Sequence, residues 1–172
     1  DDNSDDLTRD ILKAYALQYK KIKLVLSPVK NGAAFSRNLG LDIAVGEFVI
    51  FLDADDFFSS NILSSLYSEI TKSNADVVLF NCEKINMKNS EHEKLPCISE
   101  NYIQYIDDTF EYRSVRNDIP LYALVAVPWN RFLRRQFLIE NNIYFHGAAR
   151  ALLKHHLSKY KYIHNSSHHF GC

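Results

Sequence analysis

The chain has 172 residues, of which 47% are apolar and 13% aromatic, and its formal net charge at pH 7 is −1. This composition supplies the core of one domain and excludes a disordered chain. The near-neutral charge gives no support to a nucleic-acid-binding protein. No apolar run reaches the ~20 residues that cross a bilayer. The three cysteines form no C-x-x-C pair, which is typical of a reducing compartment rather than a disulfide scaffold.

The N-terminal segment has the pattern of a helix. Apolar side chains recur at helical spacing on one face, at Leu7, Ile11, Leu12, Tyr15 and Tyr19. This spacing predicts an amphipathic helix. Asp5 and Asp6 precede it and suit a helix N-terminus, both as caps and through the helix dipole.

A strand-like and a helix-like segment follow. Residues 22–26 are a short β-prone run, and Asn31-Gly32 has the composition of a turn. Residues 33–45 have a helical pattern. The first amides of such a helix can face a phosphate group.

The stretch from Glu47 to Phe58 carries the most chemical information. Five apolar residues, 48–52, are followed by Asp53, Asp55 and Asp56. So short an apolar run predicts a strand buried on both faces, in the centre of a parallel sheet. The carboxylates would then emerge at the edge where α/β proteins bind ligands. Because they repel one another, a hard divalent cation completed by a nucleotide diphosphate would compensate them. The alternative is a plain acidic turn that closes the strand.

The middle of the chain continues the alternation of helix and strand. Apolar spacing over 62–70 predicts an amphipathic helix, and residues 76–80 form the next strand. This alternation favours a parallel, doubly wound α/β sheet. Residues 84–101 are polar and predict a loop or insertion with an edge strand nearby. Residues 102–127 are rich in tyrosine and allow no assignment.

A basic segment follows the tyrosine-rich region. Residues 133–142 predict a helix, and three arginines lie in or just before it, Arg131, Arg134 and Arg135. The simpler interpretation is a solvated basic face. The alternative is contact with an anionic donor or with the phosphate of a lipid acceptor.

The C-terminal tail, residues 146–172, holds six of the seven histidines. His164 and His168 are four residues apart, so on a helix they would share a face and could bind zinc. The tail has no carboxylate that could orient such ligands. The other interpretation, a C-terminus outside the pattern of the preceding domain, is therefore preferred.

Several motifs occur together in order. They are Asp1-Asp2-Asn3-Ser4-Asp5-Asp6, Asn31-Gly32, Ser36-Arg37-Asn38-Leu39-Gly40, Gly46-Glu47, Asp53-Ala54-Asp55-Asp56, and Pro128-Trp129-Asn130-Arg131-Phe132-Leu133-Arg134-Arg135. In order and spacing they resemble the family 2 glycosyltransferases over residues 1–145. The resemblance implies the GT-A fold, a Rossmann-like α/β, doubly wound, mostly parallel sheet. In that family the first strand and its helix precede the position of Asp1, so the chain is expected to be a fragment.

The resemblance also assigns roles to individual residues. It implies that Asp2 contacts the nucleotide base and that Arg37 lies near the nucleotide, although Ser36 replaces the usual alanine. Asp53 and Asp55 match the D-x-D pair. Asp53 would face the ribose and the metal, and Asp55 would bind Mn²⁺ or Mg²⁺ directly. Residues 129–131 would lie near the acceptor.

The implied activity is inverting sugar transfer from a nucleoside diphosphate sugar to a hydroxyl of a glycan or lipid-linked acceptor. The residue bias hints at a bacterial enzyme of polysaccharide biosynthesis, located in the cytoplasm or at the inner face of the membrane. The family places its catalytic base in an acidic pair after the segment matched here by residues 142–145. No Asp or Glu occurs from residue 141 onwards, so no catalytic residue is identified. His146 is a possible substitute, since an unperturbed pKa of ~6.5 suits a base. The alternative is an inactive remnant that acts at most as a nucleotide-binding or interaction module.

Overall fold

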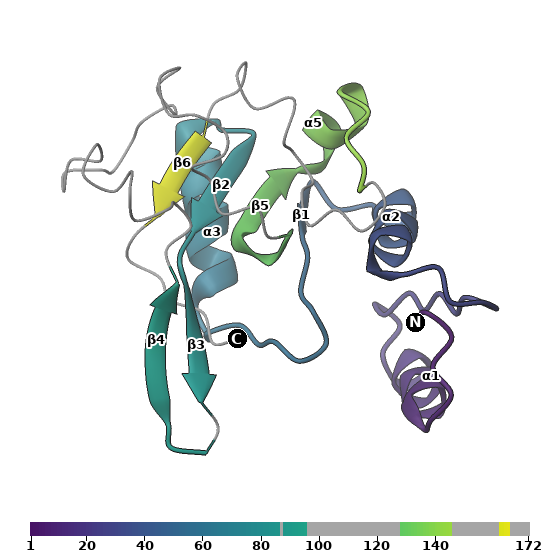
Figure 1. Ribbon diagram of the computed structural model, residues 1–172. Coiled ribbons are helices and arrows are strands. Elements are labelled where there is room, and N and C mark those ends of the chain that lie inside the picture. The colour runs from purple at the N-terminus through teal and green to yellow at the C-terminus, as the bar shows by residue number, and fades with distance from the viewer. Residues whose placement is uncertain (87, 96–127, 146–161, 166–172) are drawn as a thin grey trace. The chain divides into compact units, whose positions relative to one another are not determined.

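The computed structural model describes residues 1–86, 88–95, 128–145 and 162–165. The chain divides into two compact units (Figure 1). The first comprises Asp1–Val45 and Tyr144–Arg150, and the second comprises Gly46–Ile143 and Ala151–Cys172. Each unit contains part of the predicted site, and each is described in turn.

The second unit is built on a mixed four-stranded sheet. Its order is β1 (Phe48–Ile50), β5 (Arg131–Arg134), β2 (Val77–Phe80) and β6 (Tyr162–Asn165). Strand β5 is antiparallel to both of its neighbours, and β6 is parallel to β2. Strands β1 and β2 therefore run in the same direction, as α/β proteins require, with one reversed strand between them.

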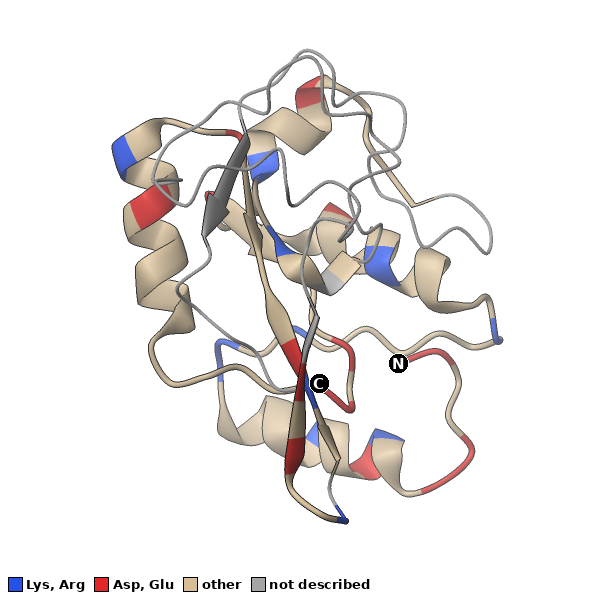
Figure 2. Cartoon of the chain, turned by 60° about the vertical axis from the view of Figure 1, so that its left-hand side comes forward, with Lys and Arg blue, Asp and Glu red and all other residues tan. Residues whose placement is uncertain are grey.

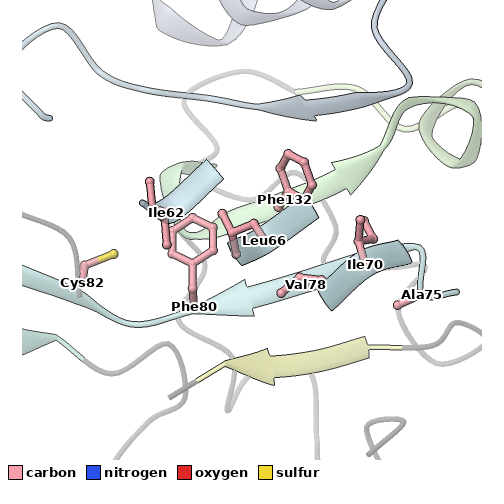
Figure 3. Packing of buried hydrophobic residues seen from close by; sticks show 8 residues of the cluster. All are labelled: Ile62, Leu66, Ile70, Ala75, Val78, Phe80, Cys82 and Phe132. Carbon is pink, nitrogen blue, oxygen red and sulfur yellow. The ribbon is translucent and has the colours of Figure 1, made fainter. Parts of the chain in front are cut away.

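One helix, α3 (Ile62–Ser73), covers this sheet and provides the core of the second unit. Its buried side chains recur every four residues, at Ile62, Leu66 and Ile70, which places them on one helix face. They pack against Val78, Phe80 and Phe132 (Figure 3). Asn74 ends the helix in the left-handed conformation, with φ of 50°, as is common at helix C-termini.

Strand β1 exists, but its predicted burial is wrong. It lies at one end of the described sheet, and Phe48, Val49 and Ile50 are only half-buried. Phe48 and Ile50 still pack against the core below α3. The Phe48 ring stacks on Phe132 with centroids 5.2 Å apart. An apolar run cannot distinguish a central strand from one that has a single covered face.

Two further predicted elements are correct only in part. Residues 133–142 were expected to be one helix, but Leu133 and Arg134 belong to β5, and α5 spans only Arg135–Glu140. Sheet pairing has overridden the local helical pattern there. The predicted loop at 84–101 contains most of a hairpin, formed by β3 (Cys82–Asn86) and β4 (Glu91–Leu95). Residues 102–127 and the tail histidines other than His164 lie outside the described residues.

The first unit contains two helices, α1 (Thr8–Gln18) and α2 (Ala33–Ile43). The N-cap residue of α1 is Leu7, without a side-chain cap, so the predicted cap at Asp5 or Asp6 is wrong. Asp6, one residue earlier, still accepts from the amide of Thr8 at 2.9 Å. The predicted apolar face of α1 is largely exposed, with Leu7 72% and Ile11 54% accessible. Helix α2 buries Leu41. Leu41 and Phe145 are the buried apolar side chains among the described residues of this unit, so it depends less on apolar burial than the second unit.

The β-prone run at 22–26 forms no strand, yet its end pairs with the N-terminus. The α-amino nitrogen of Asp1 donates to the Val25 carbonyl at 2.8 Å, and the Ser27 amide donates to the Asp1 carbonyl at 2.9 Å. These two bonds hold the N-terminal segment beside the segment that leads into α2.

Candidate functional site

Asp2 is held at the N-terminus of α2 by two backbone amides. Its Oδ1 accepts from the Asn31 amide at 2.8 Å, and its Oδ2 accepts from the Gly32 amide at 2.7 Å. Gly32 has φ of 87°, which a glycine adopts without strain. These bonds lower the pKa of the Asp2 carboxyl. Asp2 is therefore an oriented, ionised acceptor, and its remaining lone pairs can accept further N–H donors.

A polar cluster supports the segment that carries Asp2. The Asp1 side chain is 2% exposed and pairs with Arg9, with Nε and Oδ2 3.4 Å apart. Arg9 also donates to Asn3 Oδ1 at 2.8 Å and to the Ser27 carbonyl at 3.2 Å. Asn31 completes the cluster by donating to Ser27 Oγ at 3.1 Å. The N-terminal acidic segment (Figure 2) is thus part of the scaffold of the first unit.

Arg37 lies on α2 and contacts an aromatic ring from a distant part of the chain. Its guanidinium carbon is 5.5 Å from the centroid of the Phe145 ring, within the range of a cation–π interaction. The neighbouring residue, Asn38, binds the backbone of Phe145 at two points. Asn38 Nδ2 donates to the Phe145 carbonyl at 2.9 Å, and the Phe145 amide donates to Asn38 Oδ1 at 2.9 Å.

The predicted acidic turn follows β1 in the second unit. The Asp56 amide donates to the Asp53 carbonyl at 3.1 Å, which closes the turn. The pKa of Asp56 is raised, first by burial and then by repulsion from Asp55 and Asp53. Burial is the larger cause, and the repulsion from Asp55 and Asp53 shows that the three carboxylates lie near one another at this turn. A divalent cation would relieve that repulsion, so the residues suit such an ion.

The described residues contain no group of three His, Cys, Asp or Glu side chains that could hold a metal ion. Mg²⁺ is commonly bound by one or two carboxylates together with phosphate oxygens and water. Asp53 and Asp55 fit that donor set.

The Pro128–Asn130 turn lies at the same edge of the sheet as the acidic turn. Ile50 pairs with Phe132 in the antiparallel register of β1 and β5. Asp53 lies three residues after Ile50, and Trp129 lies three before Phe132, so both segments leave the sheet at the carboxyl end of β1. Asn130 and Arg131 are 1% and 2% exposed. The D-x-D segment and the segment predicted for the acceptor side therefore share one edge.

The prediction of a solvated basic face is wrong. Arg131 is buried. Arg134 lies 5.2 Å above the Phe48 ring, donates to Glu47 Oε1 at 3.1 Å and has its Nε 3.9 Å from Asp76 Oδ1. Arg135 donates to the Gly46 carbonyl at 2.7 Å. Arg134 and Arg135 therefore tie the β5–α5 junction to the segments that precede β1 and β2.

The predicted site residues fall into two pairs. Asp2 and Arg37 belong to the first unit, and Asp53 and Asp55 belong to the second. That the pairs meet around one ligand stays a prediction. Sequence reasoning assigned no role to Asn38 or Phe145. Asn38 follows Arg37 in the motif Ser36-Arg37-Asn38-Leu39-Gly40. This position could have indicated a functional role for Asn38.

A family model described as "Glycosyl transferase family 2" matches residues 1–160. Among curated relatives, a cholesterol galactosyltransferase of Borreliella burgdorferi is 29% identical over 157 residues, which cover 83% of this chain and 40% of that protein. A UDP-Glc:α-D-GlcNAc-diphosphoundecaprenol β-1,3-glucosyltransferase of Escherichia coli is 38% identical over 86 residues, 50% of this chain and 33% of that protein.

Solved structures show a shared fold. S. aureus TarS 1-349, in complex with UDP-GlcNAc, has a TM-score of 0.74 and 22% identity, covering 100% of this chain and 47% of TarS. The mannosyltransferase PcManGT of Pyrobaculum calidifontis, in complex with GDP-Man and Mn²⁺, has a TM-score of 0.62 and 17% identity, covering 100% and 46%. The chain spans less than half the length of these relatives. Within the described residues, no helix has the length and apolar character to cross a bilayer.

Proposed function

The chain belongs to glycosyltransferase family 2, and from this premise we propose that it transfers a sugar from a nucleoside diphosphate sugar to a hydroxyl of a glycan or lipid-linked acceptor. The observation that carries the proposal is the acidic turn at the carboxyl end of β1, where burial and neighbouring carboxylates raise the pKa of Asp56. Excess negative charge at this edge suits a cation-bridged diphosphate.

For donor recognition we assign Asp2 to the base and Arg37 to the nucleotide. Asp2 stays ionised because two backbone amides lower its pKa, so it accepts hydrogen bonds from the N–H groups of a base. The Arg37 guanidinium supplies positive charge and planar N–H donors, which match phosphate oxygens. The structures of TarS with UDP-GlcNAc and of the mannosyltransferase with GDP-Man support a nucleotide sugar as donor.

For the metal we assign Asp55 as a direct ligand of Mn²⁺ or Mg²⁺, with Asp53 facing the ribose and the metal. A bound divalent cation would stabilise the charge that grows on the departing diphosphate. The Mn²⁺ in the mannosyltransferase complex supports this assignment. Asp53 and Asp55 would orient the diphosphate so that the anomeric carbon faces the acceptor.

For the acceptor we propose a hydroxyl that attacks with inversion, at the sheet edge next to the Pro128–Asn130 turn. The name of the E. coli relative gives a diphosphoundecaprenol-linked acceptor, which supports a lipid-linked substrate here. Such an acceptor would place the protein at the inner surface of the cell membrane. A positioned carboxylate base would accept the hydroxyl proton, and the proposal leaves that base unassigned.

The test is calorimetric titration of the full chain with UDP, GDP and CDP, with Mn²⁺ or with EDTA. We expect one diphosphate to bind in Mn²⁺ and to lose most of its affinity in EDTA, because two carboxylates facing a diphosphate repel it. Asp55→Ala should abolish the binding that depends on the cation. Asp42→Asn, an exposed carboxylate on α2, is the matched control and should bind as the wild type does. Equal affinity in EDTA would contradict the metal assignment.

A second candidate, an inactive remnant that binds nucleotide at most, is favoured by one observation. No carboxylate side chain occurs from residue 141 to Cys172, and general-base catalysis contributes about 10²–10⁴-fold. The discriminating assay measures donor consumption with a panel of UDP-, GDP- and CMP-sugars and simple acceptors. Donor binding with negligible acceptor-dependent turnover would support the remnant. Robust turnover that His146→Ala leaves unchanged would show that the base lies elsewhere in the chain.

A further inference from the structure

Phe145 contacts two neighbouring residues of α2 that are far from it in the sequence, Arg37 and Asn38. Asn38 and Phe145 are 107 positions apart, yet the carboxamide of Asn38 binds both the amide and the carbonyl of Phe145, each at 2.9 Å. This two-point contact is complementary, since the NH₂ group meets the carbonyl and the carboxamide oxygen meets the amide. It fixes the Phe145 backbone against α2.

The ring of Phe145 is fixed as well. Phe145 is 3% exposed, and the Arg37 guanidinium carbon lies 5.5 Å from its centroid. Helix α2 therefore contributes two consecutive side chains to one partner. Asn38 holds the backbone of Phe145, and Arg37 lies over its ring.

This arrangement restricts a side chain that otherwise samples many rotamers. Arginine has many rotamers, and it would lose much of that freedom on binding a phosphate. Contact with the ring restricts the positions that the guanidinium can take, and Phe145 is itself held in place by Asn38. The guanidinium is thus oriented before an anion arrives.

We propose that Phe145 and Asn38 are positioning residues for Arg37, which they orient toward the donor diphosphate. Phe145 acts through its ring, and Asn38 acts by holding Phe145. The proposal rests on the proposed function, because it takes Arg37 as a nucleotide-binding residue. It adds that donor affinity depends on Phe145, which lies just before the segment in which the family has its catalytic base.

The test compares binding of the diphosphate with binding of the corresponding nucleoside, by calorimetry and NMR titration in Mg²⁺. Phe145→Leu keeps an apolar side chain but removes the π face, and we expect about 3- to 10-fold weaker diphosphate binding. Nucleoside binding should not change, because it lacks the phosphates that Arg37 would contact. Asn38→Ala should produce the same selective loss, and alanine preserves the helix.

Two variants provide controls. Phe35→Leu makes the same change on α2 at a residue that is 44% exposed, and it should leave both affinities unchanged. Phe145→Tyr keeps the aromatic face and should retain wild-type selectivity. If circular dichroism shows that Phe145→Leu is unfolded, Asn38→Ala and Phe145→Tyr decide the question.

A double mutant isolates the coupling. Once Arg37→Ala has removed the guanidinium, adding Phe145→Leu should cost no further diphosphate affinity. A further loss in the double mutant, an equal loss of nucleoside affinity in Phe145→Leu, or unchanged diphosphate binding in Asn38→Ala would overturn the inference while leaving the proposed function intact. A wild-type chain that binds none of UDP, GDP or CDP would overturn both.

Discussion

The two units are stabilised by different kinds of interaction. In the second, α3 buries Ile62, Leu66 and Ile70 against the sheet. In the first, α1 has no buried residue and α2 buries Leu41. The first unit instead relies on polar contacts that join distant segments. They are the Asp1–Arg9 pair, the two amides on Asp2 and the contact between Asn38 and Phe145.

The difference matters for function. In the second unit the residues of the core do not include the carboxylates of the acidic turn. A core substitution therefore need not alter the proposed ligand-binding residues. In the first unit the proposed ligand-binding residues are also part of the scaffold. Asp2 holds the segment before α2, and Arg37 lies against Phe145. Substitutions there should affect binding and local stability together, whereas core substitutions in the second unit should affect stability first.

The largest expected effect is truncation of Leu66 in the core of the second unit. Leu66 is 0% exposed, so Leu66→Ala should lower the free energy of unfolding by about 2–5 kcal/mol. Leu63 lies on the same helix and is 48% exposed, so Leu63→Ala should cost about 0.5 kcal/mol or less. Urea denaturation followed by circular dichroism measures both. Equal losses would show that α3 does not hold the unit through one buried face.

The next largest effect is expected in the polar cluster of the first unit. Arg9→Met leaves the Asp1 carboxylate, whose side chain is 2% exposed, without its cationic partner, at a cost of about 1–3 kcal/mol. Hydrogen exchange of the Ser27 amide, which donates to the Asp1 carbonyl, should report the loss locally. Lys13→Met removes the exposed pair with Asp10 and is the control, with at most about 0.5 kcal/mol expected. Unchanged exchange in Arg9→Met would contradict a polar scaffold.

Local patterns predicted those parts of the fold in which local and tertiary preferences agree. The helix at 62–70 and the strand at 76–80 were predicted from their regular apolar spacing, and the structure has α3 and β2 there, with one face of the helix and all of the strand buried. The comparisons confirm the GT-A class and the glycosyltransferase family. Strand β5 was missed because residues 133–142 have a continuous helical pattern. Only pairing with β1 and β2, which are distant in sequence, makes Leu133 a strand residue.

The candidate site was predictable where a motif places the residue. Asp2, Arg37, Asp53 and Asp55 were assigned by resemblance, and their roles stay predictions. The contact between Asn38 and Phe145 spans 107 positions, and no local pattern encodes such a pairing. The burial of Arg131 was missed for a related reason. Arginine is almost never fully buried, so composition alone favoured a solvated face.

A smaller effect should follow from Asp2→Asn. The Asn31 and Gly32 amides lower the pKa of Asp2, so these contacts stabilise the fold above the ordinary pKa of an aspartate, ~3.9. That contribution is lost as the pH falls through the lowered value in the folded chain. Asp2→Asn should therefore reduce exchange protection of both amides at pH 7, and the difference should narrow as the pH falls below the ordinary pKa of an aspartate. Asp5→Asn, an exposed neighbour, is the control. If the loss of exchange protection in Asp2→Asn does not depend on pH, it comes from the changed shape of the side chain and not from the lost charge.

The smallest expected effect has the opposite sign and lies in the second unit. Burial, then Asp55 and Asp53, raise the pKa of Asp56, so the wild type loses stability as the pH rises through the range above ~3.9. Asp56→Asn should therefore stabilise the cation-free chain at pH 7, by less than about 0.5 kcal/mol because the site is partly solvated. The gain should vanish near pH 3, where Asp56 is protonated whether folded or unfolded.

Mn²⁺ should cancel or reverse the gain at pH 7, since a cation at this turn favours the ionised carboxylate. Urea denaturation at both pH values, with and without Mn²⁺, measures the sign of the change in the free energy of unfolding caused by Asp56→Asn. A gain that persists unchanged in Mn²⁺ would show that the cation does not bind at this turn.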